Sequence, residues 1–155
     1  MDMKFKNTVN GSQGDVFITL NGENKRVAGF KDITVNAEIQ SEDGRILGSR
    51  TIQSKNNGVK LSGTGTVYYG TKIFTNIILK YIELGEMEEW TLQVVNRDEA
   101  AGIGKQRMLF TGCVLTGTYS LALINVENAA LESELSFTCA GVRSLESFND
   151  TALYG

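Results

Sequence analysis

The chain of 155 residues contains no histidine and no proline. Histidine is the commonest general base and metal ligand near neutral pH, so catalytic arrangements that depend on an imidazole are excluded. Proline cannot donate a hydrogen bond to a β-ladder and is kept out of the interior of sheets. Because average usage would give several prolines, their absence is consistent with long strands whose backbones are mostly paired.

Cysteine and long apolar runs are also scarce. The only cysteines are Cys113 and Cys139, and no apolar run approaches eighteen residues. Two thiols without a histidine cannot complete a four-ligand zinc site, so we expect both to be reduced core residues. The polar N-terminus does not resemble a signal peptide, and no segment predicts a membrane span. We therefore expect the protein to fold in a cytoplasm.

Length and charge restrict the class of protein further. A chain of this size predicts one domain, residues 1–155, with a core that needs no covalent support. The formal net charge of −3 does not favour a basic nucleic-acid surface. Gly102 and Gly104 precede Lys105, but the first glycine and the Ser or Thr of a phosphate-binding loop are missing. We expect no enzymatic activity, no metal and no cofactor.

The most informative stretch, Gly58 to Gly85, predicts a strand that leads directly into a helix. Val59, Leu61 and Val67 occupy alternate positions, which places them on one face of a strand. A helical period then begins, which predicts a flanking helix over about 72–84. Gly85 follows, where a left-handed cap favours glycine. The helix has an apolar stripe that we expect to lie in the core: Ile73, Phe74, Ile77, Ile78, Tyr81 and Ile82.

Alternating apolar residues predict further strands elsewhere in the chain. These are expected at residues 15–20, 25–28, 30–40, 88–96, 105–115, 118–125 and 131–140. Asn21-Gly22 predicts a tight hairpin turn between the first two. An N-terminal arm, 1–14, and a C-terminal tail, 141–155, should be flexible and loosely attached. This pattern indicates a mostly β (α+β) sandwich or barrel with one helix.

Two groups of residues are candidates for contacts with other molecules. Residues 41–57 predict a long loop in which cations surround apolar side chains, a composition typical of a contact surface; the alternative is a loop exposed to solvent. The members of this group are Arg45, Ile46, Leu47, Arg50, Ile52 and Lys55. The second group is the polar face of two strands: Thr34, Asn36, Glu38, Gln40, Ser62, Thr64 and Thr66. An ordinary solvated face would show the same alternation.

The order and spacing of these pieces resemble a known family. The relevant segments are residues 47–50 (LGSR), 63–66 (GTGT), 73–85, 89–93 (EWTLQ) and 132–138 (ESELSFT). Together they resemble the tail tube proteins of PBSX-type phage-like elements and related contractile-tailed phages, over roughly residues 7–148.

The resemblance implies a fold of two packed antiparallel sheets with a helix at the flank. It also implies that six copies join their sheets into a ring, and that rings stack into a hollow tube inside a contractile sheath. DNA would pass through the lumen without sequence-specific binding, and baseplate and tail terminator proteins would be further partners. The protein would be made in the bacterial cytoplasm and assembled into the tail of a virion or phage-like particle. On this reading the polar face lines the lumen and the 41–57 loop stacks the rings.

Two alternatives stay open at this stage. One is the ring protein of a bacteriocin-like or type VI-like secretion particle, which shares the architecture but carries no DNA. The other is a monomeric small-ligand β-barrel binding module, which should contain a closed apolar pocket.

Overall fold

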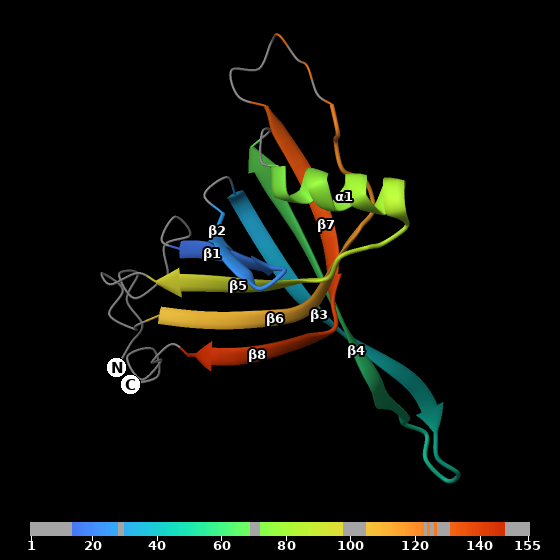
Figure 1. Ribbon diagram of the computed structural model, residues 1–155. Coiled ribbons are helices and arrows are strands. Elements are labelled where there is room, and N and C mark those ends of the chain that lie inside the picture. The colour runs from blue at the N-terminus through green and yellow to red at the C-terminus, as the bar shows by residue number, and fades with distance from the viewer. Residues whose placement is uncertain are drawn as a thin grey trace.

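A computed structural model describes residues 14–27, 30–68, 72–97, 105–122, 124, 126 and 131–147. These residues form eight strands and one helix (Figure 1). In chain order the elements are β1 (Gly14–Leu20), β2 (Glu23–Arg26), β3 (Phe30–Arg45), β4 (Ile52–Tyr68), α1 (Lys72–Leu84), β5 (Trp90–Arg97), β6 (Lys105–Thr116), β7 (Glu132–Cys139) and β8 (Gly141–Glu146). The predicted arm, apart from Gly14, and residues 148–155 of the predicted tail lie outside the described residues.

The eight strands belong to one continuous antiparallel sheet, so the mostly β fold with one helix is confirmed but the expectation of two separate sheets is wrong. The strand order is β2-β1-β5-β6-β7-β4-β3, and β8 also pairs with β6. The sheet is continuous because strand β6 pairs with strands on both sides. Its first part pairs with β5 and β8, while residues 114–116 pair with β7. One long strand therefore joins two wings, which we call the β1–β5 wing (β2, β1 and β5) and the β3–β4 wing (β7, β4 and β3).

The predicted hairpin at the start of the chain is confirmed. Asn21 and Gly22 both have positive φ, 53° and 80°, as a two-residue turn between right-twisted strands requires. The turn brings Leu20 opposite Glu23 and Phe17 opposite Arg26.

The two wings and the helix enclose a single core. Buried residues from both wings, such as Ile18, Leu92 and Leu135, belong to one cluster. Aromatic rings connect the layers: Phe74 of α1 lies edge-on to Trp90 at 5.6 Å between centroids, and Trp90 lies edge-on to Phe137 at 5.2 Å. Cys113 is also buried here and Cys139 packs against the cluster, both as free thiols.

Helix α1 buries only the first part of its predicted stripe. Phe74 and Ile77 are fully buried, and Ile73 and Ile78 pack against the core. The expectation for the other two residues is wrong, because Tyr81 is 49% exposed and Ile82 is 64% exposed. The apolar period continues along the whole helix, but the last turn of the helix lies beyond the part of the core that covers its first two turns. Gly85, with φ of 72°, ends the helix as predicted.

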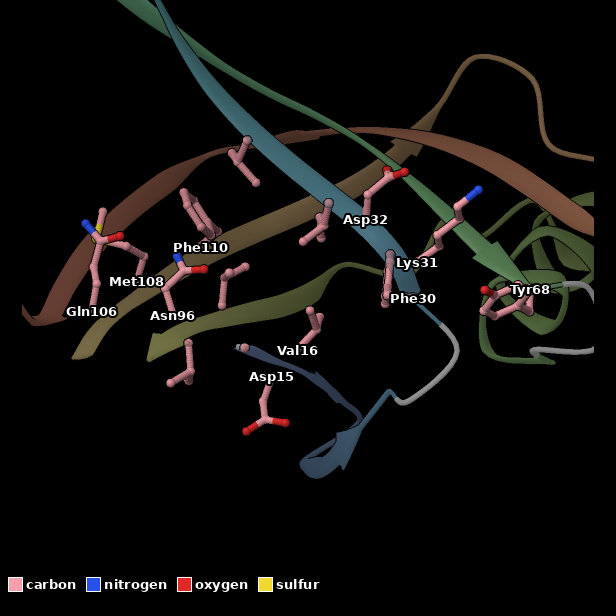
Figure 2. Close-up of a pocket in the computed structure, with 15 residues that line it drawn as sticks. Asp15, Val16, Phe30, Lys31, Asp32, Tyr68, Asn96, Gln106, Met108 and Phe110 are labelled. Carbon is pink, nitrogen blue, oxygen red and sulfur yellow. The ribbon is translucent and has the colours of Figure 1, made fainter. Parts of the chain in front are cut away.

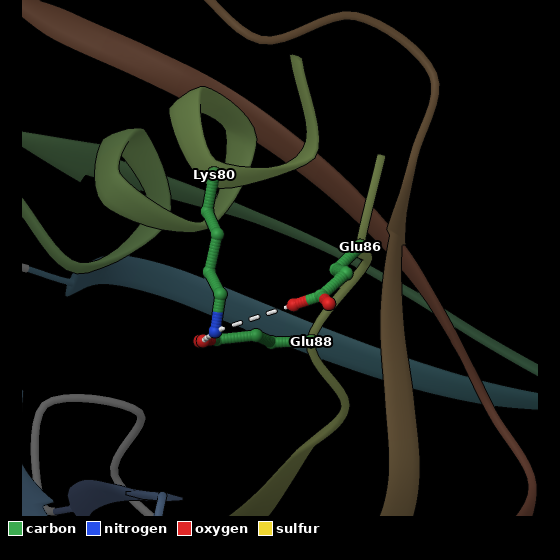
Figure 3. A network of polar contacts seen from close by, with 3 residues as sticks. All are labelled: Lys80, Glu86 and Glu88. Atoms are coloured by element: carbon green, nitrogen blue, oxygen red, sulfur yellow. Dashed lines mark hydrogen bonds and ion pairs between the residues drawn. The ribbon is translucent and has the colours of Figure 1, made fainter. Parts of the chain in front are cut away.

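Polar contacts of Lys80 connect the end of this helix to the segment that follows it (Figure 3). Its ammonium group donates a hydrogen bond to Glu88 and lies 4.0 Å from the carboxylate of Glu86. The hydrogen bond to Glu88 raises the pKa of Lys80 above its ordinary value. Since the folded-state pKa is raised, this contact stabilises the fold at neutral pH and is lost only as the pH rises through that alkaline value.

Three further expectations are corrected by the structure. Most of the predicted 41–57 loop is strand, because β3 continues to Arg45 and β4 begins at Ile52. The described residues among 118–125 are not strand. The predicted tail begins with β8, which pairs along β6 from Gly141 to Glu146. In the first and third cases hydrogen bonding to another strand, and not the local apolar pattern, decides the extent of the strand.

Candidate assembly interface

Strands β3 and β4 form a long hairpin that projects from the body of the protein (Figure 1). Their pairing runs from Phe30–Val67 at the base to Arg45–Ile52 at the far end, with irregular register after Gln40. Strand β7 pairs with β4 only from Leu61 to Tyr68. Beyond that region the hairpin has two strands and no third neighbour among the described residues. Since an isolated two-stranded hairpin is marginal in water, this part of the chain is expected to gain stability from a contact with another molecule.

All six residues of the predicted contact group lie in the projecting part and are exposed. Leu47 is fully exposed at the tip, and Ile46 and Ile52 are 58% and 56% exposed beside it. The tip is ordered by local bonds: the Ser49 amide donates to the Ile46 carbonyl at 3.0 Å, and the Thr51 amide donates to the Ser49 hydroxyl at 3.2 Å. Arg45 and Arg50 are close to this apolar tip in sequence, and Lys55 lies opposite Glu42 further down the hairpin.

The hairpin also exposes an apolar pair on the face that alternation predicts to be apolar. Ile39 and Val59 are direct cross-strand partners, and they are 63% and 59% exposed. They share a face with Leu61, which is opposite Cys139 in the neighbouring pairing. Ile39 and Val59 lie on the apolar face of the hairpin, but the β1–β5 wing does not extend far enough to cover them. Adjacent apolar residues on a projecting element are typical of an interface.

The other face of the β3–β4 wing is polar, and this polar face continues onto the end of β6. The register places Thr34 opposite Thr64, Thr64 opposite Ser136, and Ser136 opposite Thr116. All seven residues of the predicted polar group share this face, and each is exposed or half-buried. The same face also includes residues of β6 and β7 that the sequence did not assign to it, which are Thr116, Glu134, Ser136 and Thr138. Alternation along 131–140 indicated two faces, but only the pairing of β4 with β7 shows which of them continues this surface.

Strand β3 forms one border of the sheet. Among the described residues it pairs only with β4, so its outer edge is open over the sixteen residues from Phe30 to Arg45. An open edge of this length is a template for pairing with another chain. Natural proteins that keep such an edge usually cover it in an assembly.

A hollow of about 720 Å³ separates β3 from the β1–β5 wing (Figure 2). Apolar side chains, including Val16, Phe30 and Met108, line it, and the amides of Asn96 and Gln106 lie at one end. Asp15 and Asp32 also border it, but Figure 2 shows their carboxylates on the outer sides of β1 and β3. Lys31 is the remaining charged residue of the described lining, so the part of the hollow that the structure describes shows no convergent set of charged groups suited to acid–base chemistry.

Other kinds of site receive no support from the described part of the chain. It contains no group of three or more Cys, Asp or Glu residues arranged to hold a metal ion. None of the helical residues within it forms a segment long and apolar enough to cross a membrane. A sheet with an open long edge, a projecting hairpin and an extended polar face is typical of a self-assembling structural subunit.

The comparisons with known proteins identify the family. A family model described as phage tail tube protein matches residues 1–146. The chain is 31% identical over 151 residues to the phage-like element PBSX protein XkdM of Bacillus subtilis (strain 168), with 97% of this chain and 99% of that protein covered. The chain therefore belongs to the phage tail tube protein family, as the resemblance predicted. This family is structural, and the protein is not an enzyme.

Solved structures share the fold at low sequence identity. A chain in the six-fold symmetrised baseplate of the anti-feeding prophage superposes with a TM-score of 0.66 and 10% identity, covering 94% of this chain and 97% of that chain. A chain in the sheath–tube complex of an extracellular contractile injection system, PVC, in its extended state gives a TM-score of 0.66 and 12% identity, covering 90% and 93%.

Proposed function

We propose that six copies of this protein form a ring and that rings stack into a hollow tail tube inside a contractile sheath. The observation that carries the proposal is the β3–β4 wing, which combines an open edge, a polar face that continues onto the end of β6, and an apolar face that is covered at its base. Pairing of sheets edge to edge around an axis removes open edges and produces a closed barrel. The structural neighbour in a six-fold symmetrised assembly supports the number of copies.

In this ring the polar face is the inner wall. Threonine, serine and carboxylate side chains would face the lumen, and each copy contributes a formal charge of −3 overall. A wall of this kind offers few cations to phosphate, so DNA can slide through without sequence-specific binding. A lysine-rich wall would instead bind DNA with release of counterions. Lys60 is the exception within the face, and it lies directly opposite Glu38.

The projecting hairpin would stack one ring on the next. Its tip offers apolar area through Ile46 and Leu47, while Arg45, Arg50 and Lys55 can pair with carboxylates of the adjacent ring. The hairpin tip lies at one end of the molecule, and helix α1 and the start of β7 lie toward the other end (Figure 1). A contact that joins two different surfaces of successive rings can repeat along an axis without closing. A growing tube requires a contact of this kind.

Contacts with sheath, baseplate and terminator proteins follow from this role. The structural neighbours in a baseplate and in a sheath–tube complex support the first two. The helix α1 lies on the side of the β3–β4 wing away from the polar face, so it would face outward. Assembly would then place the protein in the tail of a virion or phage-like particle after synthesis in the bacterial cytoplasm.

A second candidate is the same tube in a particle that carries no DNA. The neighbour in an extracellular contractile injection system supports a tube in a secretion-like particle as the alternative. Measurement of the nucleic-acid content of purified, nuclease-treated particles would distinguish the two. Family membership favours both over a small-ligand binding module.

The stacking role is tested by the variant Leu47→Asp. Because the Leu47 side chain is fully exposed, we expect the free energy of unfolding to change by less than about 0.5 kcal/mol. Burial of a carboxylate against an apolar surface should prevent stacking. Negative-stain electron microscopy over a concentration series should show rings without tubes. The matched control, Asn24→Asp, adds the same charge on the exposed β1–β2 hairpin and should form tubes. Tubes of normal length from Leu47→Asp would contradict the stacking role.

A further inference from the structure

The fold brings the only two cysteines of the chain together. Cys113 lies in β6 and Cys139 ends β7, and their sulfur atoms are 3.2 Å apart. The pairing of β6 with β7 explains the contact, because Val114 is opposite Thr138 and the two cysteines are one step beyond that pair. Residues 26 positions apart thus form a cross-strand pair at the border of the core.

The two thiols differ in their access to solvent. Cys113 is completely buried, and Trp90 of β5 is its partner on the other side. Cys139 is only partly buried, so a small reagent in solution can reach it. Burial raises the pKa of both thiols above the ordinary value. Neither is therefore an activated nucleophile, and oxidation of the pair should be slow.

The backbone geometry at this position is compatible with a disulfide. Directly opposite residues of antiparallel strands have Cα atoms about 4.5–5.5 Å apart, and disulfides span about 4.4–6.8 Å between Cα atoms. Both side chains already point toward each other, since their sulfur atoms are in contact. A small adjustment of the side-chain torsions is enough to form the bond.

The pair lies where β6 changes partners. Thr111 still pairs with Gly141 of β8, whereas Val114 pairs with β7. Between them Gly112 has φ of 62°, and the amide of Ala140 donates to the carbonyl of Thr111 at 3.0 Å. A covalent bond here would hold the two wings of the sheet together at their junction.

We propose that Cys113 and Cys139 form an intrachain disulfide when the protein leaves a reducing environment. The oxidant is a low-molecular-weight disulfide of the glutathione type. The thiolate of Cys139 attacks one sulfur of the oxidant, which releases one small thiol and leaves a mixed disulfide. The thiolate of Cys113 then attacks the Cys139 sulfur and releases the second small thiol. The protein loses two hydrogen atoms, and the oxidant is reduced to two thiols.

The bond would close a loop that contains the whole excursion between β6 and β7. This excursion includes the exposed residues Ile124 and Val126, which are 92% and 96% exposed. Closing a loop restricts the unfolded chain more than the folded one. The unfolding midpoint should rise by roughly 5–12 °C for a chain of this size.

The test compares the full-length protein reduced with dithiothreitol and the same sample equilibrated with oxidised glutathione. Intact mass should fall by two hydrogen atoms per chain, peptide mapping should join the peptides of Cys113 and Cys139, and no thiol should react with Ellman's reagent after unfolding. The thermal midpoint should rise on oxidation. The control Cys139→Ser should retain one thiol, and oxidation should leave its midpoint unchanged.

Three results would overturn the proposal. These are two reactive thiols per chain after prolonged oxidation, a stable glutathione adduct on Cys139, and disulfide-linked dimers on a non-reducing gel. Because the main comparison uses the natural sequence, it does not depend on the folding of the variant. It also does not depend on ring formation, so failure of the proposed tube function would leave its result interpretable.

Discussion

At Gly63 of β4 the aromatic ring of Phe137 lies directly over the backbone. The two residues are cross-strand partners, and a Cβ atom added to Gly63 would lie 2.3 Å from the ring. Phe137 is 1% exposed and contacts Trp90 of the other wing. Alternation predicts a strand here, but only the structure shows that the glycine makes room for an aromatic ring from the distant strand β7. This single absence of a side chain lets the two wings pack.

Replacement of Gly63 by alanine is therefore expected to be costly. Overpacking of a filled core typically costs about 1–3 kcal/mol, and the ring of Phe137 is already buried against Trp90. The control is Gly44→Ala in the exposed hairpin, where a Cβ atom has no neighbour within 4 Å. Urea unfolding should show the loss for Gly63→Ala and a change below about 0.5 kcal/mol for Gly44→Ala. Equal stability of the two variants would contradict this account of the packing.

At the scale of the element, the helix and the hairpin each have a covered part and an uncovered part. Helix α1 packs on the sheet through Phe74 and Ile77, while Ile82 and Leu84 in its last turn are 64% and 66% exposed. The β3–β4 hairpin is covered at its base and uncovered from Ile39 and Val59 to its tip. Periodicity predicts which side of an element is apolar, but it does not measure the length of the surface that covers it.

The helix provides a direct comparison between these two parts. The ring of Phe74 lies 6.0 Å from that of Phe30 and 6.3 Å from that of Tyr119, centroid to centroid. Truncation of a buried aromatic residue costs about 3–5 kcal/mol, so Phe74→Ala should lower the free energy of unfolding by that amount. Ile82→Ala should change it by less than about 0.5 kcal/mol, as measured by chemical denaturation of the unassembled protein. A similar loss for both variants would show that the last turn is covered in the single chain.

At the scale of the whole molecule, one sheet serves two purposes. Its β3–β4 wing has an apolar face that packs on the β1–β5 wing and the helix, and a polar face with no covering layer among the described residues. The open edge of β3 and the unsupported hairpin leave the subunit with backbone and apolar surface that further copies can cover. The proposed tube uses all three features together.

The electrostatic character of the inner wall can be tested in assembled tubes. Thr64 lies near the middle of the polar face, between Thr34 and Ser136, so Thr64→Lys would place one added cation per copy in the lumen. Tubes of this variant should retain short duplex DNA at low salt and release it as salt increases. Thr64→Gln, with a neutral side chain, should behave as the natural protein in the same co-sedimentation assay. DNA retention that does not differ between the two variants would argue against Thr64 as a lumen residue.

Local chemistry alone determined several parts of this protein. The Asn21-Gly22 turn, the start and end of helix α1 and the alternation of the long strands follow from short-range preferences, and the absence of histidine removed the commonest catalytic chemistries. The order of these pieces was sufficient to predict the family.

Only the tertiary structure decided how far each element is covered and which strands meet. Strand β6 joins both wings because it changes partners at Gly112, and the hairpin reaches Arg45 and Ile52 because β3 and β4 pair through polar residues that carry no apolar period. Cys113 and Cys139 meet for the same reason. A residue's neighbours in sequence set the direction of its side chain, but its burial and its partners depend on where distant strands begin and end.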